Sequence, residues 1–253
     1  MKTLLARMIV LSLPVLVLIA VPSVRADETA DMRAIIDKAI RASGGEARVA
    51  KLRAVTWKTK VTAPTGGLPI YSDESSAQDL DQYRAEITAG EGGRVTNAIL
   101  LINRKKGWFH TRGKTIDAPA DFLAPRREIL YFLRLPEMLL PLKAGESKLS
   151  PLGEVRIGER LAVGVLVERK GYTDLSVFFD KKTGLLVKTE ARLKLPDERE
   201  VIVVFLVSDY KDFDGLKHFT QFTLEVDGAK LFDAELSDIR ALGELDDSVF
   251  AKP

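Results

Sequence analysis

The segment 175–188 constrains the fold most strongly, because it reads as two apolar runs separated by a short turn. The turn is Asp180-Lys-Lys-Thr-Gly184, and the flanking runs are rich in Val, Leu and Phe. In a hairpin turn of this length a glycine commonly takes the left-handed backbone conformation, and Gly184 is placed to do so. The segment therefore predicts an antiparallel hairpin.

The same pattern recurs along most of the chain, with apolar-rich runs of about eight to eleven residues between Gly, Asp and Lys. Strict alternation at 54–63 places Val55, Trp57, Thr59 and Val61 on one side of a strand. The run 201–207 is apolar at every position, which predicts a strand covered on both faces. Further strands are expected up to residue 116 and between 155 and 241. Together they predict one antiparallel meander, a mainly β fold with helices (α+β).

Helical spacing of apolar residues identifies the expected helices. The first covers 29–42 and ends before Gly44-Gly45, and a short second one covers 46–52. In the middle of the chain we predict a helix over 125–134 and a short helical piece after Pro136. This central segment is interpreted either as helices that pack on the sheet or as a mobile lid.

The first 26 residues predict a secretory signal peptide. Lys2 and Arg7 precede an apolar run at 8–21, and small residues lead to a cleavage site after Ala26. An uncleaved anchor is the alternative, but the run is shorter than the roughly twenty residues that span a bilayer. We therefore expect an exported, periplasmic protein in which residues 27–253 form a single domain.

Composition excludes several classes of function. Residues 27–253 contain 35 Lys and Arg against 36 Asp and Glu, which gives no basic surface for nucleic acid. Cysteine is absent, so thiolate metal sites and cysteine nucleophiles are excluded. No catalytic or nucleotide-binding motif is found, and His110 and His218 are interpreted as structural or surface residues. We expect a monomer that is not an enzyme, with no catalytic residue, metal site or cofactor.

Two charged or acidic segments have alternative interpretations. Asp212-Phe-Asp-Gly215 has the start of a calcium loop but an incomplete set of oxygen ligands, and is better interpreted as a turn between strands. Arg126-Arg127 and the basic residues 104–106 are interpreted as solvated charges, with contact to acidic lipid head groups as the alternative. Neither segment by itself predicts a reaction.

Four motifs in order resemble the LolA-like outer-membrane lipoprotein-sorting proteins, a superfamily of lipoprotein carriers. They are Gly44-Gly45 followed by Ala54-Val-Thr-Trp-Lys58, the hairpin at 177–187, Ser208-Asp-Tyr-Lys-Asp-Phe-Asp-Gly-Leu-Lys217, and Leu245-Asp-Asp-Ser-Val-Phe250. The resemblance runs from about Ala30 to the C-terminus and identifies a divergent member. It implies an incomplete, strongly curved antiparallel β-barrel of about eleven strands, with N-terminal and central lid helices around an apolar cavity.

The function implied by the resemblance is carriage of lipid or lipoprotein acyl chains in outer-membrane biogenesis, with membrane-associated transport partners. Burial of each methylene of such a chain contributes roughly 0.8 kcal/mol. A ligand-sensing or protein-interaction module on the same fold is the alternative function. The expected lipid-binding residues are Trp57, Leu101, Leu130, Leu133, Met138, Leu139, Val165, Phe205 and Phe222.

Overall fold

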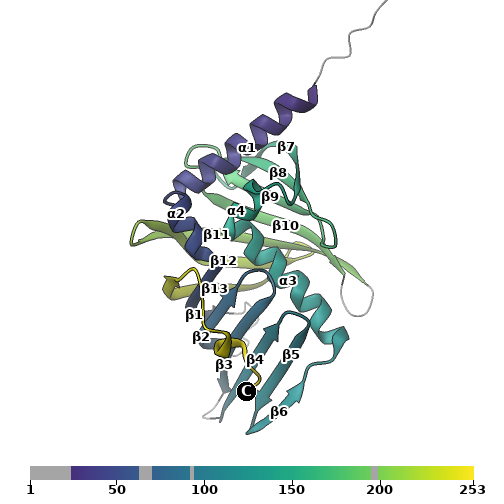
Figure 1. Ribbon diagram of the computed structural model, residues 1–253, viewed down its shortest axis with the longest axis vertical. Helices are drawn as coiled ribbons and strands as arrows, with labels where there is room; N and C mark the ends of the chain where they lie inside the picture. Colours follow the sequence, from purple (N-terminus) through teal and green to yellow (C-terminus); the bar gives the residue numbers. More distant parts are fainter. Residues whose placement is uncertain (1–23, 63–69, 92–93, 195–198) are drawn as a thin grey trace, which may run out of the picture.

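The computed structural model describes residues 24–62, 70–91, 94–194 and 199–253, and its strands form one antiparallel sheet (Figure 1). Thirteen strands follow the order β6-β5-β4-β3-β2-β1-β13-β12-β11-β10-β9-β8-β7. The outermost strands, β6 and β7, do not pair with each other in the described residues, so the sheet is open. The predicted fold class is confirmed, although the expected number of about eleven strands is two too low.

The elements have the following bounds. The strands are β1 (Ala54–Thr62), β2 (Ile70–Gln78), β3 (Gln82–Glu91), β4 (Arg94–Asn103), β5 (Lys106–Thr111), β6 (Lys114–Asp117), β7 (Lys148–Ile157), β8 (Arg160–Glu168), β9 (Leu175–Asp180), β10 (Leu186–Lys194), β11 (Glu200–Phe213), β12 (Leu216–Val226) and β13 (Ala229–Ala241). The helices are α1 (Val24–Ala42), α2 (Glu46–Val49), α3 (Ala120–Met138) and α4 (Leu140–Lys143), with 3-10 turns η1 (Ala50–Arg53) and η2 (Asp247–Phe250).

Strand order follows the sequence with one exception. Neighbours in the sheet are neighbours in the chain, except that β1 pairs with β13. The break in the sheet falls between β6 and β7, where α3 and α4 are inserted. In Figure 1, α3 runs across one face of the sheet from the end formed by β5 and β6 toward α4. The inserted helices therefore cover the face of a sheet that has not closed.

Helix α1 packs through the face that the sequence predicts. Met32, Ile36, Ala39 and Ile40 are buried and Ile35 is partly buried. The helix starts at Val24, five residues before the expected start, and the predicted cleavage point after Ala26 lies in its first turn. Residues 1–23 of the predicted signal peptide lie outside the described residues. No helix in the described ranges is long and apolar enough to cross a membrane.

Helix α3 differs from its prediction, which placed a helix at 125–134 and a separate piece after Pro136. The helix begins at Ala120 and continues through Pro125 and Pro136 to Met138. A proline inside a helix removes one backbone hydrogen bond, but Leu135 and Pro136 are both buried, and that packing offsets the loss. The break comes instead at Leu139, whose φ of 57° turns the chain into α4.

The main hydrophobic core fills the half of the sheet formed by β8 to β12. The helices α1, α3 and α4, together with α2 and η1, contribute one side of it and the strands contribute the other. Its largest fully buried side chains include Tyr131, Phe132 and Phe179. The helices and strands are thus packed against each other over this part of the sheet.

Strand β11 is covered fully on one face and partly on the other. Val201, Val203, Phe205 and Val207 belong to the main core, as alternation along a strand requires. On the opposite face Val204 is buried, but Ile202 is 37% exposed. The prediction of a strand covered on both faces is therefore correct only in part.

The hairpin between β9 and β10 has the predicted turn, with Gly184 at φ 81°. Asp180 Oδ1 accepts hydrogen bonds from the backbone N (2.6 Å) and hydroxyl (2.9 Å) of Thr183, and Asp180 O accepts one from Gly184 N at 2.8 Å. A Cβ at Gly184 would lie 2.9 Å from Lys38 Cγ on α1. The turn therefore needs glycine both for its backbone and for its approach to α1.

Replacing Gly184 with Ala is expected to lower the free energy of unfolding by about 1–2 kcal/mol, since alanine is strained at positive φ. Urea denaturation followed by circular dichroism measures the loss. Gly184→Asn is the matched control, because Asn carries the same Cβ but tolerates the left-handed region. If the Asn variant is as unstable as the Ala variant, the loss of stability comes from contact of the Cβ with Lys38 and not from the positive φ.

Candidate functional site

The candidate site is an apolar cavity of about 480 Å³ beneath α3. Its walls come from strands β1, β3, β4, β11, β12 and β13, and its roof is the middle of α3. Most lining side chains are aliphatic or aromatic. A cavity of this size and lining fits the range in which proteins bind small apolar ligands.

Strand β1 forms one wall of the cavity through alternate residues. Val55, Trp57, Thr59 and Val61 all line it. On the other face, Lys58 Nζ lies 2.7 Å from Asp238 Oδ2 in a solvent-exposed ion pair. The alternation predicted from the sequence is thus confirmed for this strand.

Aromatic rings form a continuous apolar surface on β11, β12 and β13. The ring centroid of Phe205 lies 5.6 Å from that of Phe219 and 4.8 Å from that of Phe222. Phe222 in turn lies 6.0 Å from Phe232, and all four line the cavity. Such contacts hold the rings in fixed orientations and leave their faces available to an apolar ligand.

The structure brings together five of the nine residues expected to bind lipid. Trp57, Leu130, Leu133, Phe205 and Phe222 line the cavity, whereas Leu101, Met138, Leu139 and Val165 are buried elsewhere. Leu139 and Val165 belong to the main core, which the end of α3 shares with β8. A role in lipid binding stays a prediction for all nine.

Leu101 misses the cavity because of strand register. Its neighbours Leu100 and Ile102 line the cavity, so Leu101 points to the opposite face of β4. On that face Asn103 Nδ2 donates a hydrogen bond to the carbonyl oxygen of Phe250 at 3.1 Å. The prediction that Leu101 faces the cavity was thus wrong by one residue along the strand, which is enough to place a side chain on the opposite face.

One end of the cavity is polar and consists of Arg134, Glu137 and His218. Glu137 accepts hydrogen bonds from Arg134 Nη1 and, at 2.5 Å, from His218 Nε2, while His218 Nδ1 lies 2.7 Å from the carbonyl oxygen of Phe219. Both ring nitrogens of His218 thus face hydrogen-bond acceptors. The arrangement is a hydrogen-bonded triad that joins α3 to β12.

Glu137 is ionised in this triad. Burial would raise the pKa of its carboxyl group, but the charge of Arg134 and the hydrogen bond and charge of His218 outweigh burial and lower the pKa to about 2. The side chains of Arg134 and His218 are only 3% and 4% exposed. The carboxylate is therefore the counter-ion that makes burial of the Arg134 guanidinium tolerable, and it is also a hydrogen-bond partner of His218.

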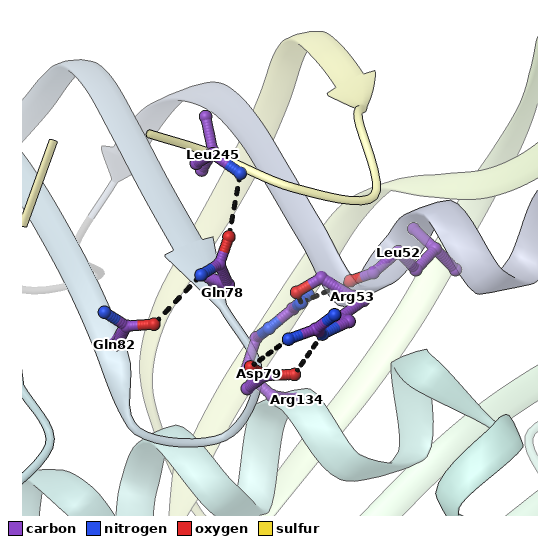
Figure 2. Close-up of polar contacts among 7 residues, drawn as sticks. All are labelled: Leu52, Arg53, Gln78, Asp79, Gln82, Arg134 and Leu245. Atoms are coloured by element: carbon purple, nitrogen blue, oxygen red, sulfur yellow. Dashed lines mark hydrogen bonds and ion pairs between the residues drawn. The ribbon is translucent and has the colours of Figure 1, made fainter. Parts of the chain in front are cut away.

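Arg134 also fastens α3 to η1, as Figure 2 shows. Its Nη2 donates to the carbonyl oxygen of Leu52 at 2.5 Å, and Arg53 next to it forms an ion pair with Asp79 at 2.7 Å. At the other end of α3 the ring of Phe122 packs edge-on against Phe109 of β5, with centroids 4.4 Å apart. Both ends of α3 thus pack against the rest of the protein, as expected for a packing helix. The middle of α3 covers the cavity.

Figure 2 also shows how the C-terminal segment is attached near this point. Gln78 Oε1 accepts a hydrogen bond from the backbone N of Leu245 at 2.8 Å, and Gln78 Nε2 donates to Gln82 Oε1 at 3.1 Å. Gln82 and Asn103 are paired residues of β3 and β4, on the face away from the cavity. The segment after β13 therefore supports the back of the cavity wall.

Sequence analysis did not identify Arg126, Arg134 or Glu137 as cavity residues. The spacing of Arg126, Leu130, Leu133 and Glu137 puts them on one helical face, and this signal would have grouped them. His218 is a structural residue as expected, and its partner Glu137 is 81 positions away. In the Asp212–Gly215 segment, the first two residues end β11 and Asp214 and Gly215 form the turn to β12, and no cluster of metal-ligating side chains occurs in the described residues.

Comparison with solved structures shows which fold the chain adopts. A LolA superfamily protein from Nitrosomonas europaea has 13% sequence identity and a TM-score of 0.53, covering 87% of this chain and 97% of that chain. A DUF1329 family protein from Desulfovibrio piger has 14% identity and a TM-score of 0.55 over the same shares. A domain described as an outer membrane lipoprotein-sorting protein, from Vibrio parahaemolyticus, has 11% identity and a TM-score of 0.51, covering 86% and 97%.

At these identities the likeness concerns the fold, and it confirms the LolA-like fold that the resemblance implied. No protein-family model and no curated protein matches the sequence.

Proposed function

We propose that this LolA-like chain is a carrier or binder of lipid or lipoprotein acyl chains, and that the cavity beneath α3 holds the chain. It acts as a single domain, residues 27–253, exported to the periplasm after removal of residues 1–26. It binds and releases its ligand without a chemical reaction. The residues that contact the ligand include Trp57, Leu130, Leu133, Phe205 and Phe222.

The observation that carries the proposal is the apolar cavity between α3 and the sheet. Aromatic and aliphatic side chains from β1, β11, β12 and β13 line it together with side chains of α3. A cavity that is mostly apolar, with a few polar groups, is the usual form of a site for a small apolar ligand. An acyl chain would contact these side chains along its length, and each methylene removed from water would add roughly 0.8 kcal/mol to binding.

The decisive experiment is analysis of lipids that co-purify with the exported protein. Purification from the periplasm without detergent, followed by organic extraction and mass spectrometry, is expected to recover acyl lipids in a fixed ratio to protein. Gly184→Asn, altered far from the cavity, is the matched control and should retain the same lipids. An empty protein that also fails to bind added fatty acid would contradict the carrier function. A cross-linked protein partner in that case would favour the interaction module.

A further inference from the structure

Three basic side chains line the cavity, and they differ in their partners. Arg134 and His218 share the carboxylate of Glu137 at one end. Arg134 also donates to the carbonyl oxygens of Leu52 and Arg53, and His218 lies against that of Phe219. Glu137 therefore already compensates the charge at this end of the cavity.

Arg126 has a different setting. Its guanidinium carbon lies 3.1 Å from the ring centroid of Phe122, and its Nη1 donates to the carbonyl oxygen of Phe122 at 3.1 Å. No carboxylate within residues 24–62, 70–91, 94–194 and 199–253 forms an ion pair with it. Its side chain is partly buried, and burial lowers its pKa below the usual value. Among the described residues, this partly desolvated cation has no ion-pair partner on the cavity wall.

The position of Arg126 is at the opening of the cavity. Ile129 and Leu231 both line the cavity and are 40% and 50% exposed, so the cavity reaches the surface at these residues. Arg126 precedes Ile129 by three residues and therefore lies on the same side of α3. The distance along the helix from Arg126 to Glu137 is about 16 Å at 1.5 Å per residue. The cavity thus has a charged mouth, an apolar middle and a neutralised polar end.

We infer that the ligand is an amphiphile with an acidic head group, a carboxylate or a phosphate, which Arg126 binds at the mouth while the apolar chain lies beneath α3. The inference rests on the proposed function and adds the chemical class of the ligand. Guanidinium groups bind both kinds of anion through paired, charge-assisted hydrogen bonds. Phe122 fixes the guanidinium by its ring and its carbonyl oxygen, and that carbonyl is a partner of Nη1 alone.

The test compares ligands that share one chain and differ only in the head group. Calorimetric titration of the full-length mature protein with dodecanoate, dodecyl phosphate and dodecanol, each below its micelle concentration, gives three dissociation constants. At least one acidic ligand is expected to bind about tenfold more tightly than dodecanol, since a charge-assisted hydrogen bond is roughly twice as strong as a neutral one. A preference for dodecanoate indicates a fatty acid, and one for dodecyl phosphate indicates a phospholipid head group.

Arg126→Gln is expected to abolish the preference for the acid, so that the acidic ligands and dodecanol bind the variant with similar dissociation constants. Arg127→Gln is the matched control, because it removes the same charge from the next position of α3 without altering a cavity residue. Arg126→Met, which keeps an apolar stem against Phe122, replaces the Gln variant if circular dichroism shows that the latter is misfolded.

The outcomes separate this inference from the proposed function. If all three ligands bind wild type equally, or if Arg126→Gln keeps the preference, the acidic head group is wrong and the acyl-chain cavity stands. If Arg127→Gln loses the preference to the same extent, general electrostatic attraction explains it and the site at Arg126 is wrong. If no ligand binds wild type, the proposed function fails and this inference fails with it.

Discussion

Replacing Leu133 with Glu is expected to weaken binding of an acyl chain by about a hundredfold or more. Leu133 lies in the middle of α3 and lines the cavity among aromatic and aliphatic side chains. A carboxylate there loses its hydration when a ligand fills the cavity, and an unpaired buried charge costs several kcal/mol. Fluorescence titration with a fluorescent fatty acyl probe measures the change.

Two variants serve as controls for Leu133→Glu. Ala124→Glu adds the same charge to α3 at an exposed position and is expected to leave binding close to wild type. Leu133→Met keeps the volume and the apolar character and should also bind. If a folded Leu133→Glu protein binds the probe as tightly as wild type, α3 does not roof the ligand site and is an ordinary packing helix.

Replacing Glu137 with Ala is expected to have the largest effect on stability, a loss of about 3–5 kcal/mol in the free energy of unfolding. The change leaves Arg134 and His218 buried without their shared carboxylate, and removal of one partner from a buried ion network is strongly destabilising. Glu128→Ala on the same helix is the control, because Glu128 forms only a weak bond, 3.3 Å long, to the backbone of Thr173. Urea denaturation at neutral pH measures both variants.

The pH dependence of stability provides an independent check on Glu137. Its pKa is lowered in the folded protein from 4.5 to about 2, so its contribution is complete above the unfolded value and is lost as pH falls toward 2. The difference in stability between wild type and Glu137→Ala should therefore shrink as the pH falls through this window. A difference that stays constant down to pH 2 would show that the carboxylate does not act through its charge.

Local patterns were sufficient to predict most of the fold. The alternation in β1 grouped four residues on one face, of which Trp57 was expected in the cavity, because one strand needs no partner to define its two faces. The turn at Asp180–Gly184 and the buried face of α1 were predicted for the same reason. The length of α3 was not predicted correctly. A proline indicates a helix end locally, whereas burial of Leu135 and Pro136 depends on the sheet beneath them.

The site was harder to predict because it depends on register and on distant pairs. Leu101 and Leu100 are equally apolar, and only the pairing of β4 with its neighbours decides which one reaches the cavity. The triad joins Glu137 to His218 across 81 positions of the chain. The helical spacing places Arg126 on the same face as Leu130 and Leu133, but only the folded sheet shows that this face covers a cavity.

The single long-range pairing in the sheet, β1 with β13, has a consequence for how the molecule assembles. The strands β1 to β6 and β7 to β13 are two local meanders, each able to form by successive hairpins, and among the strands described only this pairing joins them edge to edge. The entropic cost of closing a long loop therefore arises at this one pairing, the seam between the two meanders. Trp57 and Leu236 line the cavity from either side of that seam, so an occupant would contact both meanders at once. The free energy of binding would therefore stabilise the β1–β13 pairing, which no hairpin connects. A ligand in the cavity would hold the two meanders together.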